Sequence, residues 1–142
     1  MCDIYWANAL FSQADRDFNL TCAKHLRNIG YTVFLPQELS INHKESPTEI
    51  DIFSSDTKAI EECGILIACI DQETIDAGVA CEIGIAHVLK KCIIGLYTDI
   101  RRDRINYKIY KNPYVIGAIL ASGLIVHSMD ELVYEMDYRR KL

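Results

Sequence analysis

Several features are missing from this sequence, and each absence narrows its function. No apolar run approaches the roughly 20 residues that a membrane-spanning helix requires. The first six residues, Met-Cys-Asp-Ile-Tyr-Trp, lack the basic start and apolar stretch of a signal peptide. Basic residues do not predominate, because 15 Lys and Arg stand against 20 Asp and Glu and leave a net charge of −5. We therefore expect a cytoplasmic protein that binds neither membranes nor nucleic acid polymers.

Metal and disulfide motifs are also missing. The six cysteines form no CxxC pair, and most lie in or beside apolar stretches, where a free thiol behaves as a small hydrophobic side chain. Their even number leaves a disulfide framework formally open, but the chain is neither short nor secretory in character. The four histidines are scattered without an HExxH spacing. We expect free thiols in a reducing compartment, no metal site and no cofactor.

The common nucleotide-binding and hydrolase signatures do not occur. There is no GxxxxGK[ST] phosphate loop, no GxGxxG after the first predicted strand, and no GxSxG turn around a serine. The segment that follows the first strand, Ala-Asn-Ala-Leu-Phe at 7–11, is also not the Ser, Thr and Gly-rich loop that holds a flavin phosphate. Carboxylates remain as the chemistry available to this chain.

What is present is a regular alternation of apolar and amphipathic segments along 142 residues, enough for a single domain over 1–142. Apolar runs predict strands, and helical spacing of apolar residues predicts the helices between them. The predicted strands are 4–9, 32–35, 64–70, 92–97 and 124–126, and the predicted helices are 13–29, 46–63, 76–90, 114–121 and 128–139. This alternation predicts an α/β fold: a doubly wound, flavodoxin-like, five-stranded parallel sheet with helices on both faces.

Polar residues at the helix starts support these boundaries. Ser46 precedes Pro47 and stands three residues before Glu49, which predicts that Ser46 caps the second helix. Asp76 and Ser128 are the corresponding caps predicted for two later helices. In a doubly wound sheet the ligand binds beyond the carboxyl ends of the strands, so the segments after the strands are where a site is expected.

Three carboxylates lie in suitable places. Asp76 and Glu82 flank the start of the helix over 76–90, in Asp-Ala-Gly-Val-Ala-Cys-Glu-Ile-Gly, and Asp56 lies within the preceding helix. Gly78 and Gly84 each cost about 1 kcal/mol in a helix relative to Ala, which suggests close approach of a ligand or a neighbouring helix. Each carboxylate also has a simple structural explanation: a helix cap for Asp76, a solvated position for Asp56, and pairing with an arginine for Glu82.

Taken together, these residues resemble a family. Tyr5-Trp-Ala-Asn-Ala-Leu-Phe11 is similar to the Tyr-x-Ala-Gly-x-x-Phe opening of nucleoside 2'-deoxyribosyltransferases, with Asn8 where Gly is usual. Phe-Leu-Pro-Gln at 34–37 resembles their second-strand exit, and Asp-x-Gly-x-x-x-Glu-x-Gly at 76–84 resembles their central motif. Asn-Pro-Tyr-Val-Ile-Gly at 112–117 resembles the segment that reaches a neighbouring subunit's site.

The resemblance implies N-glycosidic chemistry and assigns roles to individual residues. Glu82 matches the nucleophile that forms a covalent deoxyribosyl intermediate, and Tyr5 matches the residue that orients it. Asp56 matches the residue that protonates or positions the base. Asp76 and Asn112 match positions that hold the sugar near its 5' hydroxyl. The further substrate-binding positions implied by the motifs are Phe11, Gln37 and Gly78.

The same resemblance implies the partners and leaves alternatives open. The substrates are deoxynucleosides and free nucleobases, and a homo-oligomer with sites shared between subunits is expected. Relatives that hydrolyse nucleoside 5'-monophosphates tend to have Ser where this chain has Asp76, so an unphosphorylated nucleoside is favoured. The cluster Arg101, Arg102 and Arg104 would suit a phosphate, although a solvated loop is its simpler explanation. The alternatives are an N-glycoside hydrolase and a non-catalytic nucleoside or nucleotide sensor on the same fold.

Overall fold

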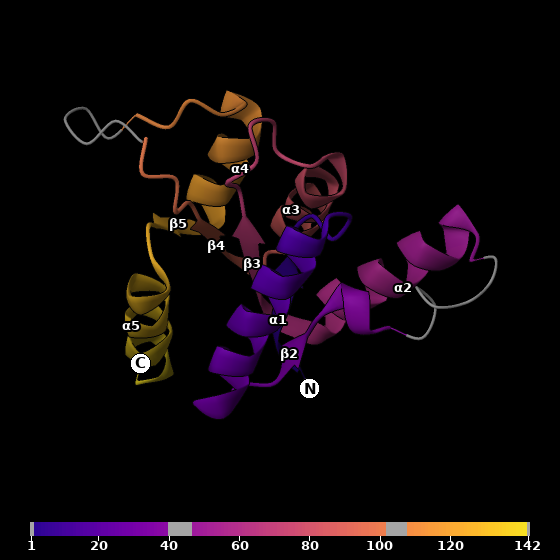
Figure 1. The fold of residues 1–142 in the computed structure, drawn as a ribbon, viewed down its shortest axis with the longest axis horizontal. Helices are drawn as coiled ribbons and strands as arrows, with labels where there is room; N and C mark the ends of the chain where they lie inside the picture. The colour runs from indigo at the N-terminus through magenta and orange to yellow at the C-terminus, as the bar shows by residue number, and fades with distance from the viewer. Residues whose placement is uncertain (1, 40–46, 102–107, 142) are drawn as a thin grey trace.

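A single parallel sheet forms the centre of the protein (Figure 1). The computed structural model describes residues 2–39, 47–101 and 108–141. The strands follow the order β2-β1-β3-β4-β5, and every pair of neighbours is parallel. They are β1 (Cys2–Ala7), β2 (Val33–Phe34), β3 (Cys63–Cys69), β4 (Cys92–Leu96) and β5 (Gly123–Val126). This order confirms the predicted doubly wound, flavodoxin-like sheet.

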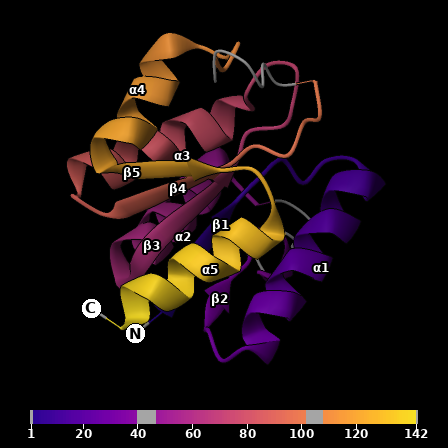
Figure 2. The same ribbon diagram turned by 90° about the vertical axis from the view of Figure 1, so that its left-hand side faces the viewer.

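Helices cover both faces of this sheet, as Figure 2 shows. One face packs against α1 and α5, while α2, α3 and α4 pack on the other, because right-handed crossovers place successive helices on opposite sides where the strand order reverses. The helices are α1 (Gln13–Asn28), the short 3-10 helix η1 (Pro36–Glu38), α2 (Glu49–Glu62), α3 (Ala77–Val88), α4 (Pro113–Ser122) and α5 (Met129–Arg140).

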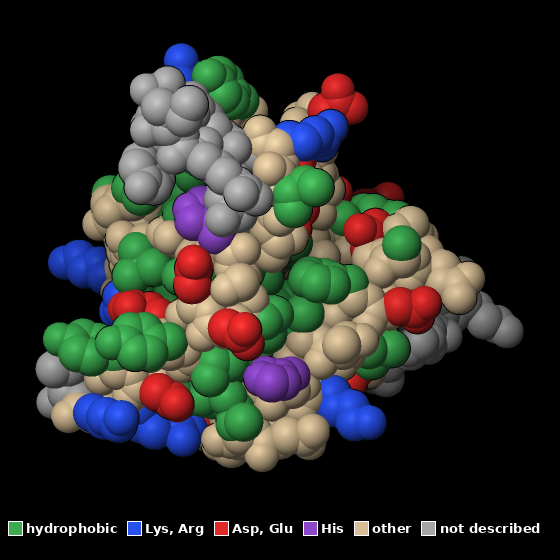
Figure 3. Space-filling view, turned by 60° about the vertical axis from the view of Figure 1, so that its left-hand side comes forward, with side chains coloured by type: hydrophobic (Ala, Val, Ile, Leu, Met, Phe, Trp, Pro, Cys, Tyr) green, Lys and Arg blue, Asp and Glu red, His purple; other side chains and the backbone are tan. Residues whose placement is uncertain are grey.

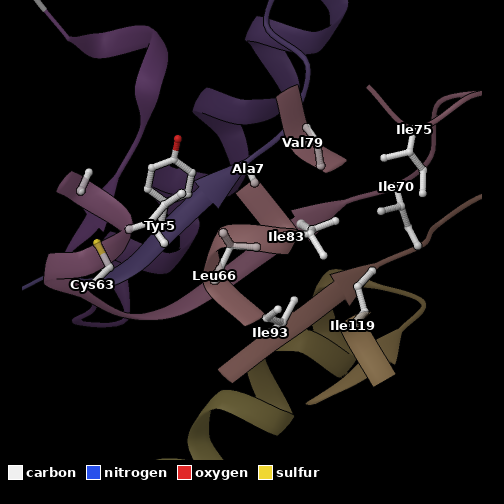
Figure 4. Packing of buried hydrophobic residues seen from close by; sticks show 14 of the residues in the cluster. Tyr5, Ala7, Cys63, Leu66, Ile70, Ile75, Val79, Ile83, Ile93 and Ile119 are labelled. Carbon is white, nitrogen blue, oxygen red and sulfur yellow. The ribbon is translucent and has the colours of Figure 1, made fainter. Parts of the chain in front are cut away.

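Each face has its own apolar core. Alternate residues of a strand point to opposite faces, so Tyr5 and Ala7 pack beneath α2 and α3, whereas Ile4 and Trp6 pack beneath α1. Figure 4 shows the first of these clusters, with the Tyr5 ring among apolar side chains and its hydroxyl directed away from them. The Tyr5 hydroxyl is therefore a polar group from β1 that lies at the edge of an apolar core.

The start of α2 differs from the prediction. Thr48, and not Ser46, is the N-cap, so the predicted cap at Ser46 is wrong, and Ser46 itself lies outside the described residues. The Thr48 hydroxyl accepts from Asp51 N at 3.1 Å, and the Asp51 carboxylate accepts from Thr48 N at 3.2 Å. This reciprocal pair satisfies two backbone donors at once, and Glu49, the predicted partner of Ser46, is instead the first residue of the helix. The predicted caps Asp76 and Ser128 are confirmed.

Two strand ends also differ. β1 spans Cys2–Ala7, two residues earlier than predicted at both ends, and β2 consists of only two residues. Asn8 follows the last residue of β1, and hydrogen bonds with Asn19 and Gln72 hold its side chain. Pro36 starts η1, since a residue without a backbone N–H is suited to the first turn of a helix and not to a continuing strand.

The cysteines and the charged surface residues are the last features for which there was an expectation from the sequence. All six cysteines are free thiols. Within the described residues, no helix is long and apolar enough to cross a bilayer. On the face seen in Figure 3, basic side chains lie at several places around the outline, two of them side by side at the lower left, with acidic and apolar side chains between these places. Arg101 forms an ion pair with Asp99 at 2.6 Å, whereas Arg102 and Arg104 lie outside the described residues.

Candidate active site

The centre of the candidate site is a hydrogen bond between two residues 77 positions apart. Tyr5, on β1, donates its hydroxyl to Oε1 of Glu82, on α3, at 2.7 Å. The sheet holds Tyr5 fully buried, and α3 carries Glu82 over the carboxyl edge of β1 and β3. Among the described residues no hydrogen bond to Oε2 of Glu82 accompanies this one, so Tyr5 holds one carboxyl oxygen and the other has no hydrogen-bond partner there.

Two adjoining cavities open at Glu82, with volumes of about 280 and 210 Å³. Four residues line both of them and so form their common boundary: Ile52, Asp56, Gly78 and Glu82. The larger cavity, which we call the helix-side cavity, lies between α2 and α3 and is otherwise lined by Glu49, Phe53, Thr57, Ile60, Cys81 and Ile85. The smaller, the loop-side cavity, adds Asn8, Ala9, Leu10, Phe11, Pro36, Asp76 and Val79.

The charges around these cavities are of one sign. Glu49, Asp56, Asp76 and Glu82 contribute carboxyl groups, and none of the described residues that line either cavity is Lys, Arg or His. The possibility that Glu82 pairs with an arginine is therefore not realised among the described residues, where its partner is the Tyr5 hydroxyl. An acidic, partly apolar space of this kind favours a neutral or cationic ligand over an anion.

Burial sets the protonation of Glu82. The pKa of Glu82 is raised to about 8, chiefly by desolvation and to a lesser degree by the nearby carboxylates of Asp56 and Asp76, while the hydrogen bond from Tyr5 opposes the rise. The same burial, together with the negative charge of Glu82, holds the pKa of Tyr5 far above its ordinary value, so Tyr5 remains a hydrogen-bond donor at every accessible pH. Glu82 is thus a carboxyl group that gains or loses its proton near neutrality.

The carboxyl group of Asp56 is the second one in the site whose pKa is raised. It lies on α2 at the boundary of the two cavities, where desolvation raises its pKa to about 6. Two carboxyl groups with displaced and different pKa values in one cleft are a common basis for acid–base chemistry. The simple explanation of Asp56 as a solvated helix residue does not apply, since solvent alone would leave its pKa near 4.

Asp76 serves as a structural cap and also borders the loop-side cavity. Its Oδ2 accepts from the backbone N–H groups of Gly78 and Val79 at 2.9 and 3.2 Å. A Cβ at Gly78 would lie 3.0 Å from that same oxygen, which explains the glycine. Gly84 is different, because a Cβ there would meet no described atom within 4 Å, so no neighbouring helix among the described residues approaches it closely.

Two residues that were expected to bind substrate lie outside both cavities at Glu82. Gln37 accepts from Asn19 Nδ2 at 2.9 Å and donates to the backbone oxygen of Arg16, and it lines neither cavity. Asn112 caps α4 and lines a separate cavity of about 230 Å³ with Glu73, Thr74 and Tyr110 among others. Phe11, by contrast, borders the loop-side cavity with 76% of its surface exposed. The roles assigned to these residues stay predictions.

Sequence reasoning missed some of the lining. Ile52 and Phe53 form an apolar wall on the outer part of α2, and 57% of the Phe53 surface is exposed. Their signal was an apolar pair on a helix whose other half is buried. Asn8 was noted only as a departure from the motif, although it is buried and lines the loop-side cavity. Among the described residues, no group of three His, Cys, Asp or Glu side chains is placed to hold a metal ion.

Comparisons with known proteins identify the family and the fold of this chain. The sequence profile described as nucleoside 2-deoxyribosyltransferase matches residues 4–135. A search of curated protein sequences gives no significant match. Among solved structures, a conserved protein from Enterococcus faecalis V583 is 33% identical with a TM-score of 0.87, and the alignment covers 98% of this chain and 99% of that one.

Two further structures share the fold at lower identity. A 2-deoxyribosyltransferase from Bacillus psychrosaccharolyticus is 21% identical with a TM-score of 0.73, covering 92% of this chain and 90% of that one. A CMP N-glycosidase from Clostridium botulinum is 21% identical with a TM-score of 0.62, covering 96% and 98%. The likeness to these two structures shows that the chain shares their fold.

Proposed function

Because this chain belongs to the nucleoside 2-deoxyribosyltransferase family, we propose that it transfers 2-deoxyribose between nucleobases through a covalent intermediate on Glu82. Family membership indicates an enzyme that transfers or hydrolyses glycosyl groups. The observation that supports the finer proposal is the Tyr5–Glu82 hydrogen bond of 2.7 Å at the boundary of two acidic cavities. A carboxyl group that is held by one oxygen and open at the other is suited to nucleophilic attack.

The proposed reaction is a double displacement, as in retaining glycosidases. Glu82 Oε2 forms a bond to the anomeric carbon while the bond from that carbon to the base nitrogen breaks. The electron pair of the broken carbon–nitrogen bond leaves with the base. Asp56 gives its proton to the departing base. A second base then attacks the anomeric carbon, its surplus proton returns to Asp56, and the Glu82 carboxylate is released.

The protonation states of the two carboxyl groups fit these roles in one way only. The reactive form needs Glu82 ionised and Asp56 protonated, which is the minor arrangement of the singly protonated pair when the pKa of Glu82 is about 8 and that of Asp56 about 6. The Tyr5 hydroxyl favours the ionised form of Glu82, because it donates to the carboxylate. We assign Tyr5 this positioning role.

The charge of the cavities supports an unphosphorylated sugar. Asp76 lines the loop-side cavity, and its carboxylate can accept a hydrogen bond from a 5' hydroxyl but repels a phosphate. The apolar wall of Ile52, Phe53 and Ile85 in the helix-side cavity suits the flat face of a nucleobase. We therefore place the base between α2 and α3 and the sugar beneath the loop after β1.

The active species in this proposal is a homo-oligomer. Asn112 lines a cavity separate from Glu82, so it contributes to catalysis only if it completes the site of another subunit. Exposed apolar side chains on α3 and α4, including Val88, Tyr114 and Leu120, offer a surface that a second copy would cover.

A single assay tests the function. The protein is incubated with 2'-deoxyinosine and adenine, and products are separated by chromatography. Base exchange gives 2'-deoxyadenosine and hypoxanthine, hydrolysis gives free 2-deoxyribose, and a nucleoside sensor gives neither. The expected result is exchange, abolished in Glu82→Ala together with any covalent adduct formed by a 2-fluoro-2-deoxyribosyl probe. Near-native turnover by Glu82→Ala would disprove the mechanism.

A further inference from the structure

A chain of carboxamides, buried at Asn8 and Asn19 and half-buried at Gln72, reaches the lining of the loop-side cavity at Asn8. Asn19, on α1 and 2% exposed, accepts at Oδ1 from Trp6 Nε1 at 3.0 Å and from Asn8 Nδ2 at 2.7 Å. Its Nδ2 donates to Ala9 O at 3.1 Å, and Gln72 Nε2 donates to Asn8 Oδ1 at 2.6 Å. The chain thus joins β1, α1 and the segment after β3.

The orientation of every amide in this chain follows from Trp6. An indole N–H can only donate, so Asn19 must present its oxygen to Trp6 and therefore also to Asn8. Asn8 is then obliged to present nitrogen to Asn19 and oxygen to Gln72. One hydrogen of Asn8 Nδ2 is used in this way, and no bond to the described residues uses the second.

Asn8 differs from the other polar side chains around the same cavity. The loop-side cavity is lined by the carboxyl groups of Asp56, Asp76 and Glu82, and by the carboxamide of Asn8. An ionised carboxylate only accepts hydrogen bonds, so Asn8 is the one side chain of the described lining that donates in every protonation state. A sugar hydroxyl both donates and accepts, and it is satisfied best between an acceptor and a donor.

We propose that Asn8 is a specificity-determining residue that donates its second Nδ2–H to the 5' hydroxyl of the 2-deoxyribose, while that hydroxyl donates to Asp76. This inference rests on the proposed function and adds to it a recognition element supplied by the loop after β1. Asn19 and Trp6 act through Asn8 as positioning residues, because they fix which end of its amide faces the cavity.

The test compares substrates that lack one hydroxyl. Initial rates with hypoxanthine as acceptor are measured for 2'-deoxyadenosine, 2',5'-dideoxyadenosine and 2',3'-dideoxyadenosine, with the wild type and Asn8→Ala. One lost hydrogen bond between neutral groups corresponds to roughly a three- to tenfold fall in kcat/KM. We expect that fall for 2'-deoxyadenosine and a much smaller one for the 5'-deoxy analogue, so that the ratio between these two substrates shrinks.

Two further variants keep the test decisive. Asn8→Leu keeps a side chain of similar size and removes the donor without bringing an acceptor against Asn19 Oδ1, and it should shrink the same ratio if Asn8→Ala folds poorly. Gln72→Leu removes one bond of the chain while leaving both the donor and Asn19 in place, and its ratio should stay near that of the wild type. Circular dichroism and melting temperature compare the folding of all variants.

The proposal is overturned if Asn8→Ala lowers kcat/KM equally for 2'-deoxyadenosine and 2',5'-dideoxyadenosine. It is also overturned if the variant instead changes the discrimination against 2',3'-dideoxyadenosine. Either result leaves base exchange itself intact. Absence of turnover of 2'-deoxyadenosine and 2'-deoxyinosine by the wild type would overturn the proposed function as well, so the two failures are distinguished by the wild-type rates.

Discussion

At the scale of single residues, the unusual feature is that Glu82 keeps its proton at neutral pH. Burial raises the pKa of Glu82 to about 8 from an ordinary value of 4.5. Between these values the folded chain holds a proton that the unfolded chain releases, so stability falls as the pH rises from about 4.5 to about 8. Burial of Glu82 in the site therefore lowers the free energy of unfolding at neutral pH.

Replacing Glu82 with Gln should remove this penalty. Glutamine keeps an oxygen that accepts from Tyr5 but cannot ionise, so Glu82→Gln should be more stable than the wild type by roughly 2–3 kcal/mol at pH 7, and no more stable at pH 4. Urea denaturation at the two pH values measures the difference. A variant that is less stable than the wild type at pH 7 would contradict a raised pKa at Glu82.

The pH dependence of the reaction should show both carboxyl groups. The singly protonated pair is lost below pH 6, where both groups are protonated, and above pH 8, where both are ionised, so kcat/KM should be bell-shaped with limbs near these values. In Asp56→Asn the alkaline limb should disappear, because the proton lost there is the one that Asp56 needs. A wild-type profile that is flat from pH 5 to 9 would exclude this pair.

At the scale of elements, the start of α3 combines a structural and a recognition role. Asp76 caps the helix through Gly78 and Val79, and its charge borders the loop-side cavity. The two roles can be separated, since Ser is also a good N-cap and carries no charge. Substitution at this position therefore tests substrate recognition without removing the cap.

Asp76→Ser should narrow the preference for nucleosides over their 5'-monophosphates. Two unit charges about 4 Å apart at an effective dielectric near 20 repel by roughly 4 kcal/mol, or about three orders of magnitude in rate. Side-by-side kinetics on deoxyadenosine and its monophosphate should show the gap in the wild type and a reduction of about tenfold or more in the variant. Equal or better use of the monophosphate by the wild type would indicate a hydrolase of nucleoside monophosphates.

At the scale of the whole molecule, one chain lacks part of the expected site. Asn112 caps α4 beside Glu73 and Tyr110, in a cavity distinct from the two at Glu82. A closed oligomer would bring the Asn112 of one subunit to the cavity of another. Its amide nitrogen is available for this purpose, since the cap uses only Oδ1.

Mixing two inactive variants tests this arrangement. Asn112→Ser keeps a capping hydroxyl but removes the amide, and Glu82→Ala removes the nucleophile. Subunits of the two variants, once exchanged, should recover part of the wild-type activity, because a hybrid pair contains one intact site. Unmixed samples are the control, and failure to recover activity despite proven subunit exchange would contradict a shared site.

Much of this protein was determined by its sequence alone. Apolar strand segments, caps at Asp76 and Ser128, and the alternation of strand and helix depend on neighbours a few residues away, so they predicted a parallel, doubly wound sheet correctly. The spacing of the motif at 76–84 likewise placed Glu82 on a helix over the carboxyl edge of the strands. The exact start of α2 was missed because Ser46 and Thr48, two residues apart, are each followed three residues later by an acidic side chain, so the local pattern fits either cap.

Only the tertiary structure decided how the site residues lie and ionise. The bond from Tyr5 to Glu82 joins segments 77 residues apart, and the raised pKa values of Glu82 and Asp56 come from packing that no local pattern records. Gln37 is hydrogen-bonded to α1, and Asn112 lines another cavity, although the motifs of both residues resemble substrate-binding segments. Sequence specifies local geometry through nearby backbone and side-chain preferences, whereas desolvation and long-range hydrogen bonds exist only once the chain is folded.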